Sequence, residues 1–224
     1  MPTSLSDPGA AEPPLAGQVG LTLLASLVAG MMDAVGYIQL GGLFVSFMSG
    51  NSTHLGMSIA KGDGAAVLAA LAIVAAFVAG ALGGTLLYEA ALPGRRLRLV
   101  LVVELGLVLA ALALAWLGWP TLGLAVVAFA MGVLNLVHRT IAGADIGRSF
   151  ITGALFGLGQ AVAHVLRGTG RAATALAYGG AWLAFVTGAV AGMLILLRLG
   201  LVGALCAASV LVAALLLLAI RVGR

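Results

Sequence analysis

The sequence predicts an all-α membrane protein with six transmembrane helices and two short re-entrant or broken helices, arranged as two inverted-topology repeats. Three observations lead to this fold class. First, 62% of the 224 residues are hydrophobic and only 8% are charged, whereas a soluble domain carries about 25% charged residues. Second, eight apolar segments follow one another along the chain, and two of them are short. Third, motifs of the first half recur in the second half.

Segment length separates the predicted spans from the two short segments. A bilayer core of about 30 Å needs roughly 20 helical residues, and the segment at 46–60 would cover only ~22 Å. The segment at 149–165 is the second short one. Residues 1–16 carry no basic residue and are rich in Pro, Ser and Ala, so we expect a disordered cytoplasmic tail before a single transmembrane domain at 17–224. The six predicted spans are 17–38, 65–91, 97–117, 121–137, 172–197 and 199–220.

The distribution of basic residues predicts how the chain threads through the membrane, because cytoplasmic loops are enriched in Lys and Arg. If all eight segments cross, the two sides carry five and six basic residues. If the two short segments enter and leave on the same side, only Lys61 and Arg198 lie opposite the other nine. The second arrangement is favoured, and it puts both termini in the cytoplasm. A broken helix that crosses fully remains the alternative.

An internal repeat supports this arrangement. Gly30-x-x-Asp33 in the first span matches Gly132-x-x-Asn135 in the fourth, and residues 77–84 match residues 185–192 at five of eight positions. Three crossings per half would turn the second repeat (about 121–220) upside down relative to the first (about 17–117). The GxxxG spacing predicts close helix contacts at Gly80, Gly84, Gly188 and Gly192.

A polar interruption stands out within the apolar sequence. Residues 49–54 place five hydrogen-bonding side chains around a single glycine, and a weaker copy lies at 149–157. An unpaired polar group in hydrocarbon costs several kcal/mol, and paired polar breaks in two halves are typical of a transporter binding site. The candidate residues for binding a substrate or ion are Asp33, Ser49, Gly50, Asn51, Thr53, His54, Asn135, Thr152 and Gly153.

Each candidate role has a structural alternative. Asp33 lies inside the first span, where a carboxylate needs a partner, a cavity or a proton; it could supply charge to the site or bond to the neighbouring polar break. Asn51 and Thr53 could cap a half-helix that starts after Gly50, or merely satisfy its broken backbone. His54 could relay a proton or pack as a hydrogen-bonded residue. Glu104 could line a cavity or pair with a basic residue.

Residues 29–37, AGMMDAVGY, and residues 40–53, LGGLFVSFMSGNST, resemble the YoaK-like family of bacterial integral membrane proteins, also called DUF1275. The resemblance covers nearly the whole chain after the tail. It implies a small polytopic protein of the bacterial inner membrane, and it implies no particular substrate. The second polar break is less polar here than is typical of the family.

These observations predict a secondary transporter or channel for a small solute or ion, with a site between the two polar breaks. The alternative is a non-transporting membrane module that binds a lipid or a partner protein. The sequence is also compatible with assembly of the chain into a homo-oligomer. We expect no enzyme activity, no cofactor and no metal site, because the sequence contains no catalytic motif and its three histidines lack ligand spacing. The scattered basic residues also argue against nucleic acid as a partner.

Overall fold

The computed structural model describes residues 15–92, 94–137, 140–141, 144–145 and 151–222, and this part of the chain is almost entirely helical. Its only strands are β1 (Thr140–Ile141) and β2 (Ala144–Asp145), an antiparallel pair that joins Thr140 to Asp145 and Ile141 to Ala144. The expected tail lies outside the described residues except for its last two, which begin the first helix. The helices are α1 (Leu15–Gln39), α2 (Met48–Lys61), α3 (Gly64–Ala90), α4 (Arg96–Trp116), α5 (Pro120–Leu134), α6 (Ile151–Leu166) and α7 (Ala172–Val222).

Four of the described helices, α1, α3, α4 and α7, are long and apolar enough to cross a membrane, while α5 and α6 are shorter apolar helices. The 51 residues of α7 would extend ~77 Å as one straight helix, more than twice the hydrocarbon thickness. The helix breaks at Gly200, whose φ of 67° and ψ of −172° are not helical and suit glycine. Each half, 172–199 and 201–222, is therefore long enough to cross by itself.

The fourth predicted span is shorter than expected. Residues 121–137 were expected to be helical, but α5 ends at Leu134, which leaves a helix of only ~22 Å. Asn135 ends the helix as its C-cap, and its side-chain Nδ2 donates back to the Met131 carbonyl at 2.8 Å. Leu136 and Val137 then bond three residues back, in a turn rather than a helix. Apolar residues continue past Asn135 with Leu136 and Val137, so the hydropathy of the sequence does not show where α5 ends.

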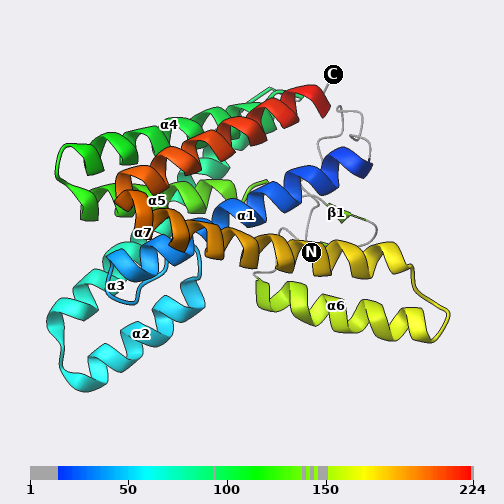
Figure 1. Cartoon of the computed structure of the whole chain (residues 1–224), viewed down its shortest axis with the longest axis horizontal. Coiled ribbons are helices and arrows are strands. Elements are labelled where there is room, and N and C mark those ends of the chain that lie inside the picture. Colours follow the sequence, from blue (N-terminus) through cyan, green and yellow to red (C-terminus); the bar gives the residue numbers. More distant parts are fainter. Residues whose placement is uncertain (1–14, 93, 138–139, 142–143, 146–150, 223–224) are drawn as a thin grey trace.

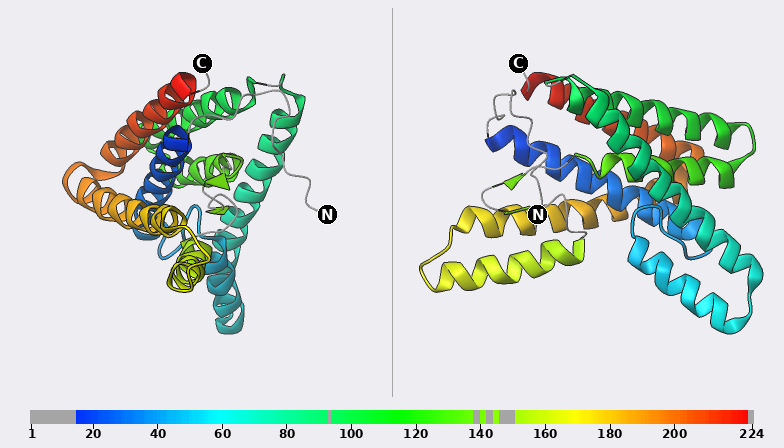
Figure 2. Two further views of the ribbon diagram at one scale, coloured as in Figure 1. Left: turned by 90° about the vertical axis from the view of Figure 1, so that its right-hand side faces the viewer. Right: turned by 180° about the vertical axis from the view of Figure 1, so that it is seen from behind.

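The two helices that carry the polar breaks, α2 and α6, run toward opposite ends of the molecule. In Figure 1, α2 begins near the middle and ends at the lower left, whereas α6 begins near the middle and ends at the right. The view from behind in Figure 2 shows the same arrangement. Each short helix lies beside the helix that follows it, since α2 packs against α3 and α6 packs against α7. Both therefore form hairpins with their own neighbours in the chain.

Glycines permit a close crossing between α1 and the first half of α7. A Cβ atom at Gly30 would collide with the backbone carbonyl of Phe185, and one at Gly188 would collide with the carbonyl of Leu27. One turn further along, a Cβ at Gly192 would lie 2.6 Å from the Met31 carbonyl oxygen. Backbone meets backbone here, so no side chain can rotate away to make room.

The crossing of α3 and α5 is built in the same way. A Cβ atom at Gly80 would collide with the carbonyl of Phe129, and one at Gly132 would collide with the carbonyl of Phe77. A Cβ at Gly84 would lie 3.2 Å from the Val133 Cα. These two crossings bring helices of the first half of the chain against helices of the second half.

Candidate functional site

A non-helical segment at 40–47 connects α1 to α2, and the Asp33 carboxylate holds it in place. Asp33 Oδ1 accepts hydrogen bonds from the backbone N–H groups of Val45 at 3.0 Å and Ser46 at 2.7 Å, and Oδ2 accepts one from Ser46 Oγ at 2.7 Å. Asp33 is only 3% exposed. Charge-assisted bonds of this kind are the stronger ones in proteins, so this side chain fixes the path of the segment.

Asn51 holds the same segment from the other side. Its Oδ1 accepts from the Phe44 N–H at 2.8 Å, and its Nδ2 donates to the Phe44 carbonyl at 2.7 Å. The side-chain amide thus pairs with both backbone groups of one residue, as a neighbouring strand would. Asn51 is fully buried. Asp33 and Asn51 together satisfy the polar groups of consecutive residues that could not otherwise be placed among apolar helices.

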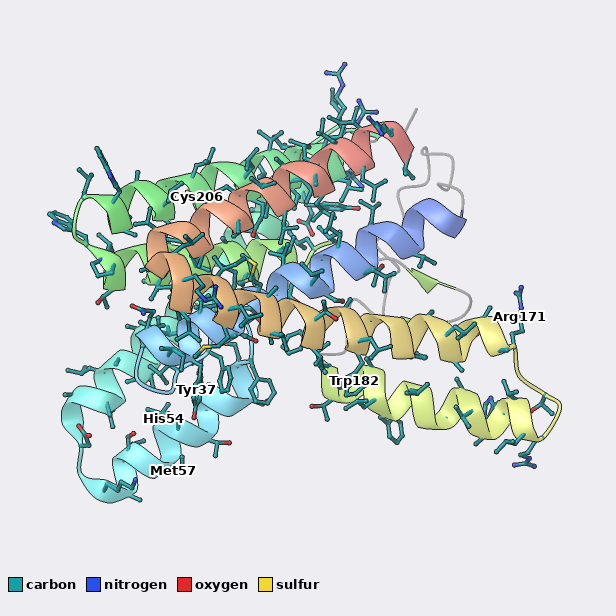
Figure 3. The ribbon with its side chains drawn as sticks, in the orientation of Figure 1. Tyr37, His54, Met57, Arg171, Trp182 and Cys206 are labelled. Carbon is teal, nitrogen blue, oxygen red and sulfur yellow. The ribbon has the colours of Figure 1, made fainter. Side chains whose placement is uncertain are left out.

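Three aromatic rings, one from α1 and two from the segment itself, pack against one another here. The ring centroids of Tyr37 and Phe44 lie 5.0 Å apart, and those of Phe44 and Phe47 lie 5.2 Å apart in an edge-to-face contact. A Cβ at Gly50 would lie 2.5 Å from Phe47 Cδ1, so any larger residue at position 50 would displace the Phe47 ring. Half-buried His54 approaches Ser58 Oγ through Nδ1 at 3.4 Å, and Figure 3 shows it with Tyr37 in the region of α2.

The remaining polar residues of the first break lie on the exposed side of α2. Ser49, Ser52 and Thr53 are exposed. The hydroxyl of Ser52 donates to the Met48 carbonyl at 2.8 Å, and that of Thr53 donates to the Ser49 carbonyl at 3.0 Å. These bonds use the donors but leave oxygen lone pairs available, and no described side chain caps α2 at Phe47. The Met48 N–H bonds to the Ser46 carbonyl at 3.1 Å, and the N–H groups that follow it in a first turn can face a ligand.

The second-half candidates are arranged differently. Asn135 bonds to its own helix at Met131, whereas its counterpart Asp33 bonds to the segment before α2. Thr152 is exposed and Gly153 is half-buried in the first turn of α6. The residues that precede α6, at 146–150, lie outside the described part of the chain. The structure thus brings Asp33 and Asn51 together around one loop, the segment at 40–47.

Ser46 is a site residue that the sequence reasoning missed. It is buried, 7% exposed, and supplies two of the three hydrogen bonds to Asp33. The polar interruption in the sequence was defined as residues 49–54, and this definition left out Ser46, which lies less than one helical turn before it. Within the described residues, no three His, Cys, Asp or Glu side chains gather where they could hold a metal ion.

Replacing Asn51 with alanine should lower the thermal unfolding midpoint of the purified protein. The change leaves the half-buried Phe44 N–H and carbonyl without their Asn51 partners, and each loss costs about 1–3 kcal/mol. Ser52→Ala is the matched control, since Ser52 is exposed and its hydroxyl bonds only to its own helix. Equal midpoints for the two variants would show that Asn51 does not hold the segment.

The fold and this site define a polytopic α-helical membrane protein, in which a buried acid and a buried amide hold irregular backbone among long apolar helices. The chain belongs to the family described as "Protein of unknown function (DUF1275)", whose family model matches residues 21–218. This match confirms the resemblance seen in residues 29–53.

Two curated relatives carry the same kind of name. The chain is 34% identical to the UPF0700 transmembrane protein RA0705 of Rhizobium meliloti (strain 1021) over 184 residues, which cover 81% of this chain and 78% of that one. It is 36% identical to the UPF0700 transmembrane protein YoaK of Bacillus subtilis (strain 168) over 67 residues, 30% of each chain. No solved structure matches the chain.

Proposed function

We propose that this protein conducts a small solute or ion across the bacterial inner membrane, as a secondary transporter or channel. The observation that carries the proposal is the irregular segment at 40–47, whose backbone is held among apolar helices by Asp33 and Asn51. Within a membrane, non-helical backbone is tolerated where protein buries it or where it lines a water-filled path. Discontinuous helices of this kind form the binding sites of many transporters.

The proposed threading has six spans and two re-entrant helices, with both termini in the cytoplasm. It is supported by the course of α2 and α6, which begin near the middle and end at opposite ends of the molecule (Figure 1). It is also supported by the nine-to-two distribution of basic residues that this threading produces. The break at Gly200 divides α7 into the fifth and sixth spans.

The proposed inverted repeat rests on reciprocal glycine contacts. Gly30 meets Phe185 in one crossing and Gly132 meets Phe77 in the other, and these are matching residues of the two halves. In the same way, Gly188 meets Leu27 while Gly80 meets Phe129. A two-fold relation between the halves exchanges one set of contacts for the other, as inverted repeats do.

The proposed solute contacts are the exposed polar groups around the start of α2, together with Thr152 and Gly153 at the start of α6. The first turn of α2 has no side-chain cap and favours an anionic or polar group through its N–H donors. The hydroxyl oxygens of Ser49 and Thr53 add acceptors, and the His54 ring adds a nitrogen that donates or accepts according to its tautomer. Asp33 contributes by holding the loop, since both of its oxygens already accept hydrogen bonds.

Single cysteines test the threading, in a background where Cys206, the one native cysteine, is replaced by serine. We expect that Gly62→Cys and Gly94→Cys react with a membrane-impermeant thiol reagent from opposite sides of the membrane. Gly94→Cys and Gly170→Cys should react from the same side. Reaction of these last two from opposite sides would rule out a re-entrant α6.

Solute flux tests the function and separates it from the alternative, a membrane module that binds lipid or a partner protein. That alternative is favoured by an open apolar groove of about 320 Å³ between α3, α4 and α5, which could hold an acyl chain. Proteoliposomes should show flux above empty vesicles for at least one of the small ions Na⁺, K⁺, NH₄⁺, Cl⁻, nitrate and acetate or one uncharged polar solute. Flux equal to that of empty vesicles throughout would favour the lipid-binding module. The groove is lined by Ala76, Leu107, Ala125, Val126 and Phe129.

A further inference from the structure

A second buried acid lies away from the polar breaks, on α4. Glu104 is fully buried, and in the described part of the chain neither of its carboxyl oxygens has a hydrogen-bond partner. It lies on the packed face of α4, between Leu101 and Val108, and both of these neighbours belong to the central apolar core. An ionised carboxylate without a partner is strongly disfavoured in such surroundings.

The helices around Glu104 offer little charge to compensate it. In Figure 1, α4 runs beside the second half of α7, with α5 close by, and α4 packs against both. Residues 120–134 of α5 contain no titratable side chain, and the second half of α7 carries only Cys206 and Arg221, both exposed. The other titratable groups on α4 or on the neighbouring end of α3 are Arg96, Arg98, Tyr88 and Glu89, with Arg96 lying over the Tyr88 ring at 5.3 Å.

Packing alone does not require an acid at this position. The buried positions of α4 are 100, 101, 104, 108 and 111. The second half of α7 is buried at positions with the same spacing, 204, 205, 208, 212 and 215, and in addition at 209 and 219. Ala208 takes the place of Glu104 in this comparison, and it is also fully buried. A small apolar residue therefore suffices at the matching place, and the carboxyl of Glu104 calls for another explanation.

We propose that Glu104 is a proton-binding site, which carries a proton in the conformation seen here and exchanges it with water during the transport cycle. This inference deepens the proposed function and rests on it. The contrast with Asp33 supports the assignment: Asp33 accepts three hydrogen bonds, as a carboxylate does, whereas Glu104 accepts none. Ionisable groups buried in membrane helices commonly form proton relays.

Dicyclohexylcarbodiimide provides a test that does not depend on knowing the solute. This apolar reagent reacts with protonated carboxyl groups: the acid proton moves to a carbodiimide nitrogen, and the carboxyl oxygen bonds to the central carbon. Migration of the acyl group to nitrogen then gives a stable N-acylurea, with no leaving group. The full chain in liposomes would be treated at neutral and at mildly alkaline pH, and the modified peptides would be identified by mass spectrometry.

We expect modification at Glu104 to exceed that at Glu89, an exposed glutamate at the end of α3, by at least roughly tenfold, because the apolar reagent concentrates in apolar surroundings, where the fully buried Glu104 lies. Glu104→Gln should abolish the modification of that peptide. If Glu104→Gln fails to fold, the extent of modification at Glu104 relative to Glu89 in the wild-type chain still tests the proposal. Absence of modification at Glu104 would overturn the proposal, since the group would then be either charged or never reached.

Flux measurements separate this inference from the proposed function. For a solute that the wild type moves, an imposed pH gradient should change its flux, and Glu104→Gln should remove that response, whereas Glu89→Gln should keep it. An unchanged response in Glu104→Gln overturns the proton site and leaves the transport function standing. Modification of Glu104 without wild-type flux of any tested solute supports a protonated Glu104 that the reagent reaches, but it contradicts the transport function and, with it, proton exchange during a transport cycle.

Discussion

Replacing Gly188 with leucine is expected to prevent the chain from reaching a stable folded state in detergent. A Cβ at this position would collide with the carbonyl of Leu27 on α1, and the rest of the leucine side chain would push the two helices further apart. Overpacking a core costs about 1–3 kcal/mol when side chains can yield, and a backbone carbonyl yields less. Gly80→Leu should act in the same way through Phe129. The measurement is the fraction of monodisperse protein after size-exclusion chromatography, followed by its thermal midpoint.

Gly106→Leu is the matched control for these variants. Gly106 also lies within a long apolar helix, but a Cβ added there meets no atom within 4 Å. Leucine should be tolerated, with a change in stability within about 0.5 kcal/mol. Gly203 is a poorer control, since a Cβ there would collide with the Leu199 side chain. If Gly188→Leu and Gly106→Leu were equally stable, the close crossing of α1 and α7 would be wrong.

Replacing Asp33 with alanine is expected to have the second large effect, on both stability and flux. The variant removes the acceptor for two backbone N–H groups and one hydroxyl, all at Val45 and Ser46. Each buried donor without a partner costs about 1–3 kcal/mol, so the segment at 40–47 should lose its fixed path. The thermal midpoint should fall, and any solute flux of the wild type should be lost.

Asp33→Asn distinguishes the geometric role of Asp33 from a role for its charge. The asparagine carbonyl can still accept from both N–H groups, and its amide can donate to the Ser46 hydroxyl oxygen. We therefore expect a folded protein that retains flux and its response to pH, because the exchanged proton is assigned to Glu104. Loss of the pH response in Asp33→Asn would instead make Asp33 the titrating group.

Most helix ends could be predicted because the sequence marks them. α3 was expected at 65–91 and spans Gly64–Ala90. Asp63 caps its start through the Ala66 N–H at 3.0 Å, and Gly94, with a φ of 78°, lies in the turn that follows its end. The end of α5 was missed because the apolar pattern continues beyond Asn135. Hydropathy reports which residues avoid water, and a helix that ends inside an apolar region leaves no such signal.

The candidate site was predicted as a region but not as a set of contacts. Asp33 and Asn51 were identified because polar side chains within apolar sequence need partners. Their partners, the backbone groups of residues 44–46, could not be predicted, because the path of a non-helical segment depends on the helices packed around it. The isolation of Glu104 was hidden for the same reason, since only the packing of α4 against α5 and α7 decides which face is buried.

The central claim is that two polar breaks reach toward the middle of the membrane from opposite sides, and cysteine accessibility in intact membranes tests it most directly. Ser49 and Thr152 are exposed in the first turns of α2 and α6. In a chain with Cys206→Ser, a membrane-impermeant thiol reagent should reach Ser49→Cys from the side of Lys61 and Thr152→Cys from the side of Arg171. Reaction of both from one side, or of neither from any side, would contradict the account.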